Sequence, residues 1–108
     1  MASQIFDPET FGKQAVEVAG ILRALANERR LMILCRLVEC GEANVSALAE
    51  AVGLSQSALS QHLARLRQGK LVRTRREAQT IYYSLADPGV SKVLAALYEV
   101  YCRPARRA

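Results

Sequence analysis

Three cysteines and one histidine are the residues of this 108-residue chain with the most evident site chemistry. Cys35, Cys40 and Cys102 are odd in number and contain no CxxC pair, which argues against a disulfide framework and favours a reducing cytoplasm. A thiolate is both a nucleophile and a soft metal ligand, so these residues allow redox or metal chemistry. With His62 as its single histidine, the chain is not expected to be a zinc hydrolase or a serine-triad enzyme.

Basic side chains are concentrated between Ser55 and Tyr83. This segment has six Lys and Arg residues and one acid, whereas the remaining residues have nine of each sign, so the whole net charge of +5 lies here. A positive surface confined to one segment is typical of proteins that bind the phosphates of nucleic acid. The sequence therefore predicts double-stranded DNA as a partner.

Helix-capping residues within and just before this segment predict a helix-turn-helix. Asn44 and Gly53 can cap the two ends of a short helix over 45–52. Ser55 can cap a second helix over 56–68, which Gly69 ends. Two helices joined by three residues are expected to cross as a helix-turn-helix.

The flanking segments complete a winged version of this motif. Apolar spacing predicts helices over 9–26, 28–39 and from Pro88 to the end of the apolar pattern, and the β-rich runs 71–76 and 80–85 predict a hairpin. We expect a mainly α, single-domain winged helix-turn-helix over 1–108, in the order α-α-α-α-β-β-α, with a loose N-terminus (1–8) and a basic tail (103–108). No apolar run is long enough to span a membrane.

The outward face of the 56–68 helix has small hydroxyl and amide side chains near its start. Such groups can read base edges in a major groove, while arginines hold phosphates. We expect His62, near the edge of the core, to make a structural hydrogen bond rather than a phosphate contact. The predicted DNA-binding residues are Ser55, Gln56, Ser57, Ser60, Gln61, His62 and Arg65, with Arg73, Arg75, Arg76 and Gln79 on or beside the wing.

The first and last predicted helices suggest a homodimer. The last helix has an apolar seam of four turns, the first is rich in alanine, and a domain this small has no further layer to cover both. A two-fold dimer would present two recognition helices to a palindromic operator. The alternative is that both helices complete the core of one chain. The predicted interface residues on the last helix are Val93, Leu94, Leu97, Tyr98 and Tyr101.

Three runs of sequence resemble the ArsR/SmtB family of bacterial winged-helix repressors. They are LRALANERRLMILCRLVE at 22–39, GLSQSALSQHLARLRQGKLVRTRREAQTIYYSL at 53–85 and LAALYEVYC at 94–102. The resemblance implies a dimeric repressor, not an enzyme, which leaves its operator when an inducer binds. Metals are the inducers in many branches of the family, and thiol chemistry operates in others.

The sensor positions resemble the persulfide-sensing branch (SqrR/BigR type, with HlyU-type regulators). The arsenic-sensing cysteine pair and the zinc-sensing Asp, His and Glu set are both absent. The resemblance implies that reactive sulfur species or an oxidant bridge Cys35 and Cys102, with no bound metal or cofactor. Two alternatives remain open. Cys35 could be a small core residue beside Leu34 and Val38, or Cys40 could join the pair as a three-thiolate site for As(III), Cu(I) or Zn(II).

Overall fold

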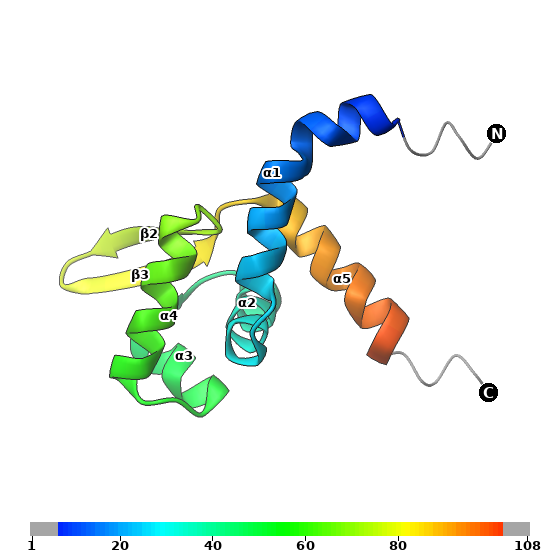
Figure 1. The fold of residues 1–108 in the computed structure, drawn as a ribbon. Coiled ribbons are helices and arrows are strands. Elements are labelled where there is room, and N and C mark those ends of the chain that lie inside the picture. The colour runs from blue at the N-terminus through cyan, green and yellow to red at the C-terminus, as the bar shows by residue number, and fades with distance from the viewer. Residues whose placement is uncertain (1–6, 103–108) are drawn as a thin grey trace.

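The computed structural model describes residues 7–102 and confirms a mainly helical winged helix-turn-helix. Over these residues five helices accompany a three-stranded antiparallel sheet (Figure 1). The elements are α1 (Pro8–Leu25), α2 (Glu28–Cys40), β1 (Ala43–Asn44), α3 (Val45–Val52), α4 (Gln56–Gln68), β2 (Val72–Glu77), β3 (Thr80–Leu85) and α5 (Pro88–Cys102).

The strand β1 corrects the predicted element order. The predicted order had no strand before the 45–52 helix, but Ala43 and Asn44 pair antiparallel with β3, so the sheet order is β1-β3-β2. A strand of two residues has no alternation to detect, so only its pairing partner defines it. The predicted wing strands are confirmed, with β2 displaced by one residue from 71–76 to Val72–Glu77.

The predicted caps of the helix-turn-helix are confirmed. The side chain of Asn44 accepts a hydrogen bond from the Ala47 amide, and that of Ser55 accepts one from the Ala58 amide. Gly53 adopts the left-handed conformation, with φ of 71°, that lets the chain turn sharply from α3 into α4. These caps fix where the two helices start and stop, and so define the angle at which α4 is presented.

The N-terminal boundary of α1 is earlier than expected. Asp7 caps α1 by accepting a hydrogen bond from the Glu9 amide, and Pro8 occupies the first helical turn. The predicted loose end of 1–8 is therefore wrong at its last two residues. Residues 1–6 and the predicted basic tail of 103–108 lie outside the described residues.

The core is built mainly from leucines of α2, α3 and α4. Its members are Leu25, Ile33, Leu34, Leu37, Leu48, Ala49, Leu59, Leu63, Leu66, Leu71, Val72, Val90 and Leu94. Cys35 and Val38 are exposed, which contradicts the alternative that Cys35 is a small core residue beside Leu34 and Val38. The face of α2 that meets α3, α4 and β3 is centred on Ile33, Leu34 and Leu37.

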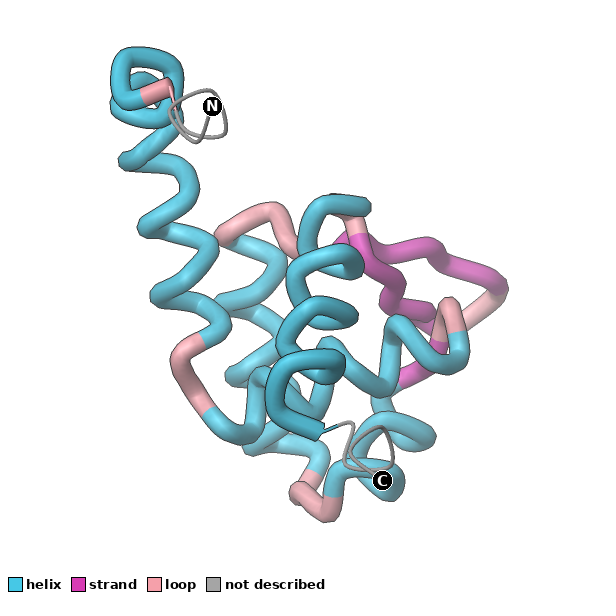
Figure 2. Tube along the Cα trace, turned by 90° about the vertical axis from the view of Figure 1, so that its right-hand side faces the viewer, coloured by secondary structure: helices cyan, strands magenta, loops and turns pink. Residues whose placement is uncertain are grey.

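The two outer helices extend on the side of the molecule opposite the wing (Figure 1). Seen from the side, α1 projects well beyond the other helices (Figure 2). The radius of gyration is 15.9 Å, whereas a compact chain of this length has about 13 Å. The outer helices are therefore not wrapped closely around the core. None of the helices within 7–102 is long and apolar enough to cross a membrane.

Candidate nucleic-acid interface and cysteine pair

The two faces of α4 differ in burial and chemistry. Leu59, Leu63 and Leu66 are fully buried and anchor the helix in the core. Ser57, Ser60 and Gln61 are exposed on the opposite side. A rigid helix therefore carries short polar side chains outward, which is the arrangement that major-groove reading requires.

Three of the predicted DNA-contacting side chains at the start of α4 are already engaged within the chain. The Gln56 amide nitrogen donates to the Ser46 hydroxyl of α3 at 3.1 Å. The Ser55 hydroxyl accepts the Ala58 amide at 3.1 Å as the cap of α4. The Ser57 hydroxyl also shares a hydrogen bond with the Ser55 hydroxyl at 3.4 Å. These contacts organise the start of α4, so Ser60 and Gln61 are the freer groups for base edges.

A basic hollow lies between α4 and the wing. It is lined by Ser60, Ala64, Arg65, Arg67, Gln68 and Tyr83. Ser60 and Arg65 were predicted to contact DNA, whereas Arg67, Gln68 and Tyr83 were not named. The positive charge of the segment pointed to Arg67, but only the folded sheet brings Tyr83 of β3 beside α4.

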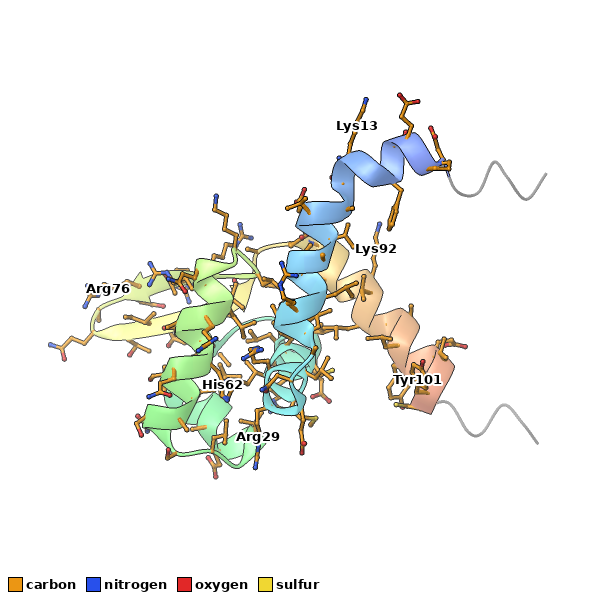
Figure 3. All side chains as sticks on the ribbon, in the orientation of Figure 1. Lys13, Arg29, His62, Arg76, Lys92 and Tyr101 are labelled. Carbon is orange, nitrogen blue, oxygen red and sulfur yellow. The ribbon has the colours of Figure 1, made fainter. Side chains whose placement is uncertain are left out.

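The wing has two faces, and its arginines are divided between them. In the strand register, Thr74 pairs with Tyr83. Side chains alternate along a strand, so Thr74 and Arg76 share a face with Tyr83, while Arg73 and Arg75 share the other. Tyr83 lines the α4 hollow, whereas Arg73 lines a separate hollow that includes Val38 of α2. Arg76, labelled in Figure 3, therefore belongs to the face of α4.

Arg75 is held by carboxylates within the chain. Its Nε and Nη2 donate to the two carboxylate oxygens of Glu42 at 2.9 and 3.0 Å, and its Nη1 donates to Glu77 at 3.0 Å. Its guanidinium also lies 4.7 Å from the ring centroid of Tyr82. The hydrogen bond from Arg75 lowers the pKa of Glu42, and the bonds to Glu42 and Glu77 raise the pKa of Arg75. Arg75 was predicted to contact DNA, but in this structure its guanidinium is occupied by Glu42 and Glu77.

His62 lies partly buried on α4 (Figure 3). Burial lowers the pKa of its imidazole, and the positive charges of Arg30, Arg65 and Arg29 lower it further. The expected structural hydrogen bond is not among the side-chain hydrogen bonds found within 7–102. His62 is thus an imidazole whose protonation is disfavoured by burial and by nearby arginines, rather than a hydrogen-bonded core residue.

The three cysteines are free thiols with exposed side chains. Partial burial raises the pKa of the Cys35 thiol most, and the negative charges of Cys102 and Glu39 raise it further. The contribution of Cys102 places it within electrostatic reach of Cys35, across the contact between α2 and α5. Cys40 instead donates from its sulfur to the Glu42 carbonyl at 3.6 Å. Within the described part of the chain, no three His, Cys, Asp or Glu side chains are grouped to hold a metal ion.

The apolar seam of α5 is bare beyond its first turns. Val90 and Leu94 are buried in the core of the single chain, so Leu94, predicted at the interface, is not available to a partner. The other predicted interface residues are exposed, namely Val93, Leu97, Tyr98 and Tyr101, and so are Val16 and Leu22 of α1. Figure 3 places Tyr101 at the opposite side of the molecule from Arg76.

Residues 27–74 match the family described as bacterial regulatory protein, arsR family. The chain is 59% identical over 83 residues to the nodulation protein NolR of Rhizobium meliloti, covering 77% of this chain and 67% of NolR. The crystal structure of the transcriptional repressor BigR from Xylella fastidiosa superposes with a TM-score of 0.84 at 39% identity, covering 91% of this chain and 99% of BigR.

A second solved structure is described as the homodimeric winged helix-turn-helix DNA-binding domain of a possible ArsR-family regulator from Mycobacterium bovis. It superposes with a TM-score of 0.74 at 36% identity and covers 87% of this chain and 86% of that one.

Proposed function

The chain belongs to the ArsR family of bacterial DNA-binding transcriptional regulators, and we propose that it is a repressor released from its operator when Cys35 and Cys102 are bridged. The inducers that we propose are reactive sulfur species, with peroxide-type oxidants acting on the same thiols. It is a regulator and not an enzyme.

The observation that carries this proposal is the electrostatic influence of Cys102 on Cys35, exerted across the contact between α2 and α5. The charge of one thiolate acts on the other across two helices that contact each other, and both side chains are open to small molecules. Cys40 is bonded to a backbone carbonyl at the far end of α2 and does not influence Cys35 in this way. The exposure of Cys35 also argues against a purely structural core role.

The bridge can form by sulfur exchange. Each of two low-molecular-weight persulfides transfers its outer sulfur to one cysteine and leaves as a thiol. The deprotonated persulfide on one cysteine then attacks the carbon-bound sulfur of the other persulfide, and hydrosulfide leaves. The product is a trisulfide, in which one added sulfur joins the two cysteine sulfurs. The sulfane sulfurs are the oxidant, and hydrosulfide takes away the electrons.

Operator binding is assigned to the exposed face of α4 and to the wing. Ser57, Ser60 and Gln61 are the proposed base-edge contacts, and Arg65 and Arg76 flank them as phosphate contacts. Two supports favour this assignment: the net charge is confined to this segment, and the hollow beside α4 is lined by arginine and amide groups.

A second copy of the chain is the proposed cover for α1 and α5. The exposed apolar side chains of these helices form the surface that a single chain leaves bare, and a family relative of this fold is homodimeric. A two-fold dimer through this surface presents two α4 helices to a palindromic duplex. Because Cys102 lies on α5, a bridge to Cys35 would tie α2 to the dimer-forming helix. Operator release then requires only that the bridged dimer bind DNA more weakly.

Mass spectrometry tests the thiol chemistry directly. The reduced protein is exposed to a low-molecular-weight persulfide, to hydrogen peroxide and to arsenite in parallel, and then analysed intact and as peptides. We expect a Cys35–Cys102 crosslink that retains extra sulfur only after persulfide treatment. The same samples are assayed for binding to a duplex that the untreated protein selects from a randomised library.

The variant Cys40→Ser is the matched control, because it removes a thiol but keeps the proposed pair. It should crosslink and release DNA as the wild type does, whereas Cys35→Ser and Cys102→Ser should do neither. A crosslink that involves Cys40, or DNA release in the Cys102→Ser variant, would overturn the assignment. Release by arsenite without any crosslink would indicate a metalloid sensor instead.

A further inference from the structure

Arg75 reaches across the full width of the wing sheet. The strand register aligns Arg75 of β2 with Tyr82 of β3, and Tyr82 with Asn44 of β1. From β2, the guanidinium lies over the Tyr82 ring and ends on Glu42, two residues before Asn44. We call the group Glu42, Arg75 and Tyr82 the wing clamp. It joins the strand at one edge of the sheet to the segment leading into the strand at the other edge.

The far end of the wing clamp is close to the start of the helix-turn-helix. Asn44 follows Glu42 by two residues and caps α3 through its side chain. The α3 helix in turn receives the side chain of Gln56, the first residue of α4, on Ser46. A chain of contacts therefore runs from the wing through Glu42 and the α3 cap to the start of the recognition helix.

The clamp geometry differs from that of an ordinary surface ion pair. Both carboxylate oxygens of Glu42 are bound by one guanidinium, which is the planar two-point contact that arginine makes and lysine does not. The Glu42 and Arg75 side chains retain only 36% and 50% of their exposure, and the Tyr82 ring backs the guanidinium. Arg75 also lies on the face of the wing opposite to the Tyr83 face that meets α4.

We propose that Arg75 is a positioning residue that fixes the angle of the wing against the helix-turn-helix, and that it is not itself a phosphate ligand. This inference rests on the proposal that the wing takes part in operator binding. Arg76, its neighbour on the other face, is then the residue that contacts phosphate, and the wing clamp positions it. The two adjacent arginines thus have different roles set by the alternation of the strand.

The variant Glu42→Gln gives opposite results under the two roles of Arg75. If Glu42 positions Arg75, the change loosens the wing and weakens operator binding about twofold to tenfold, at an unchanged salt slope. If Glu42 only withholds Arg75 from phosphate, the change removes a repelling charge, so binding tightens and the salt slope grows. Binding is measured by fluorescence anisotropy over a series of salt concentrations, on the duplex selected by the wild-type protein.

Two further variants separate failure of the clamp from failure of the wing. Arg76→Gln should weaken binding and reduce the salt slope by about one. If Arg76→Gln has no effect on binding, the proposal that the wing contacts the operator is wrong. If Arg76→Gln weakens binding but Glu42→Gln does not, only the proposed role of the wing clamp is wrong. The double variant Glu42→Gln/Arg75→Gln should bind no more weakly than Arg75→Gln. Additive losses would overturn the proposal, and thermal unfolding confirms that each variant is folded.

Discussion

The helices α4 and α5 are built on the same apolar spacing, yet the single chain uses them differently. α4 buries its whole stripe of Leu59, Leu63 and Leu66. α5 buries Val90 and Leu94 near its start and then leaves its seam exposed, including Tyr101 at 78% exposure. Since the two patterns are similar, the difference arises from what lies opposite each helix: α4 faces a complete core, and α5 faces solvent. The comparison teaches that the α4 half is complete within one chain, whereas the α5 half leaves the apolar side chains exposed that the proposed dimer would cover.

Truncating Leu63 tests the α4 half and should give the largest change. Leu63→Ala removes a fully buried side chain from the centre of the α4 stripe. We expect the free energy of unfolding to fall by about 2–5 kcal/mol, because transfer and cavity costs add. Chemical denaturation measures the change. A loss below about 1 kcal/mol would be close to that of a surface substitution, and it would show that the α4 side is not closely packed.

Placing a charge at Leu97 tests the α5 half. In a monomer, Leu97→Asp on the exposed seam should cost little, but in a dimer it buries an unpaired carboxylate at the interface. We expect the Leu97→Asp substitution to weaken dimer association by about 2–4 kcal/mol, the range of an interface hot spot. Sedimentation at several protein concentrations measures it.

The control is Lys92→Asp, a charge change at an exposed position just outside the predicted interface residues. It should leave the association state nearly unchanged. A monomeric wild type, or a Leu97→Asp variant that sediments as the wild type does, would contradict the proposed cover of α5.

Most of the α4 half could be predicted from the sequence because its signals are local. Asn44, Gly53 and Ser55 each act on residues within one helical turn, so their types are enough to place α3 and α4. The contacts that could not be predicted join distant segments. Glu42 and Arg75 are 33 residues apart, and β1 exists only through its pairing with β3. The burial of Leu94 but not Leu97 likewise depends on where α5 leaves the core.

The exposed face of α4 should determine base specificity. Gln61→Ala keeps the buried leucines and removes one amide from the proposed base-reading face. We expect discrimination against mismatched operators to fall by about 1–3 kcal/mol, while affinity for unrelated DNA changes little. Competition between the selected duplex and its single-base variants measures the loss. Equal weakening on every sequence would instead make Gln61 a backbone contact.

The α5 half should affect the chemistry of Cys35. Burial and the charge of Cys102 both keep the pKa of Cys35 above its ordinary value. Removing the second charge in Cys102→Ser should lower this pKa toward the ordinary value, so alkylation of Cys35 should begin at lower pH. Peptide mass spectrometry of alkylation against pH reports it, with Cys40→Ser as the unshifted control. If Cys35 shows the same dependence of alkylation on pH in Cys102→Ser as in the wild type, the charge of Cys102 does not affect Cys35.

His62 provides the smallest test, on the α4 side, and its sign follows from its surroundings. In the folded chain, burial and the charges of Arg30, Arg65 and Arg29 hold the pKa of the His62 imidazole below its ordinary value of 6.5. The unfolded chain therefore binds a proton at a higher pH than the folded chain does, and the free energy of unfolding must fall as pH drops below the ordinary value. His62→Gln should remove this decline, because His62 is the single histidine of the sequence. Denaturant unfolding at a series of pH values measures it, and parallel curves for the two proteins would show that the arginines around His62 do not affect its protonation.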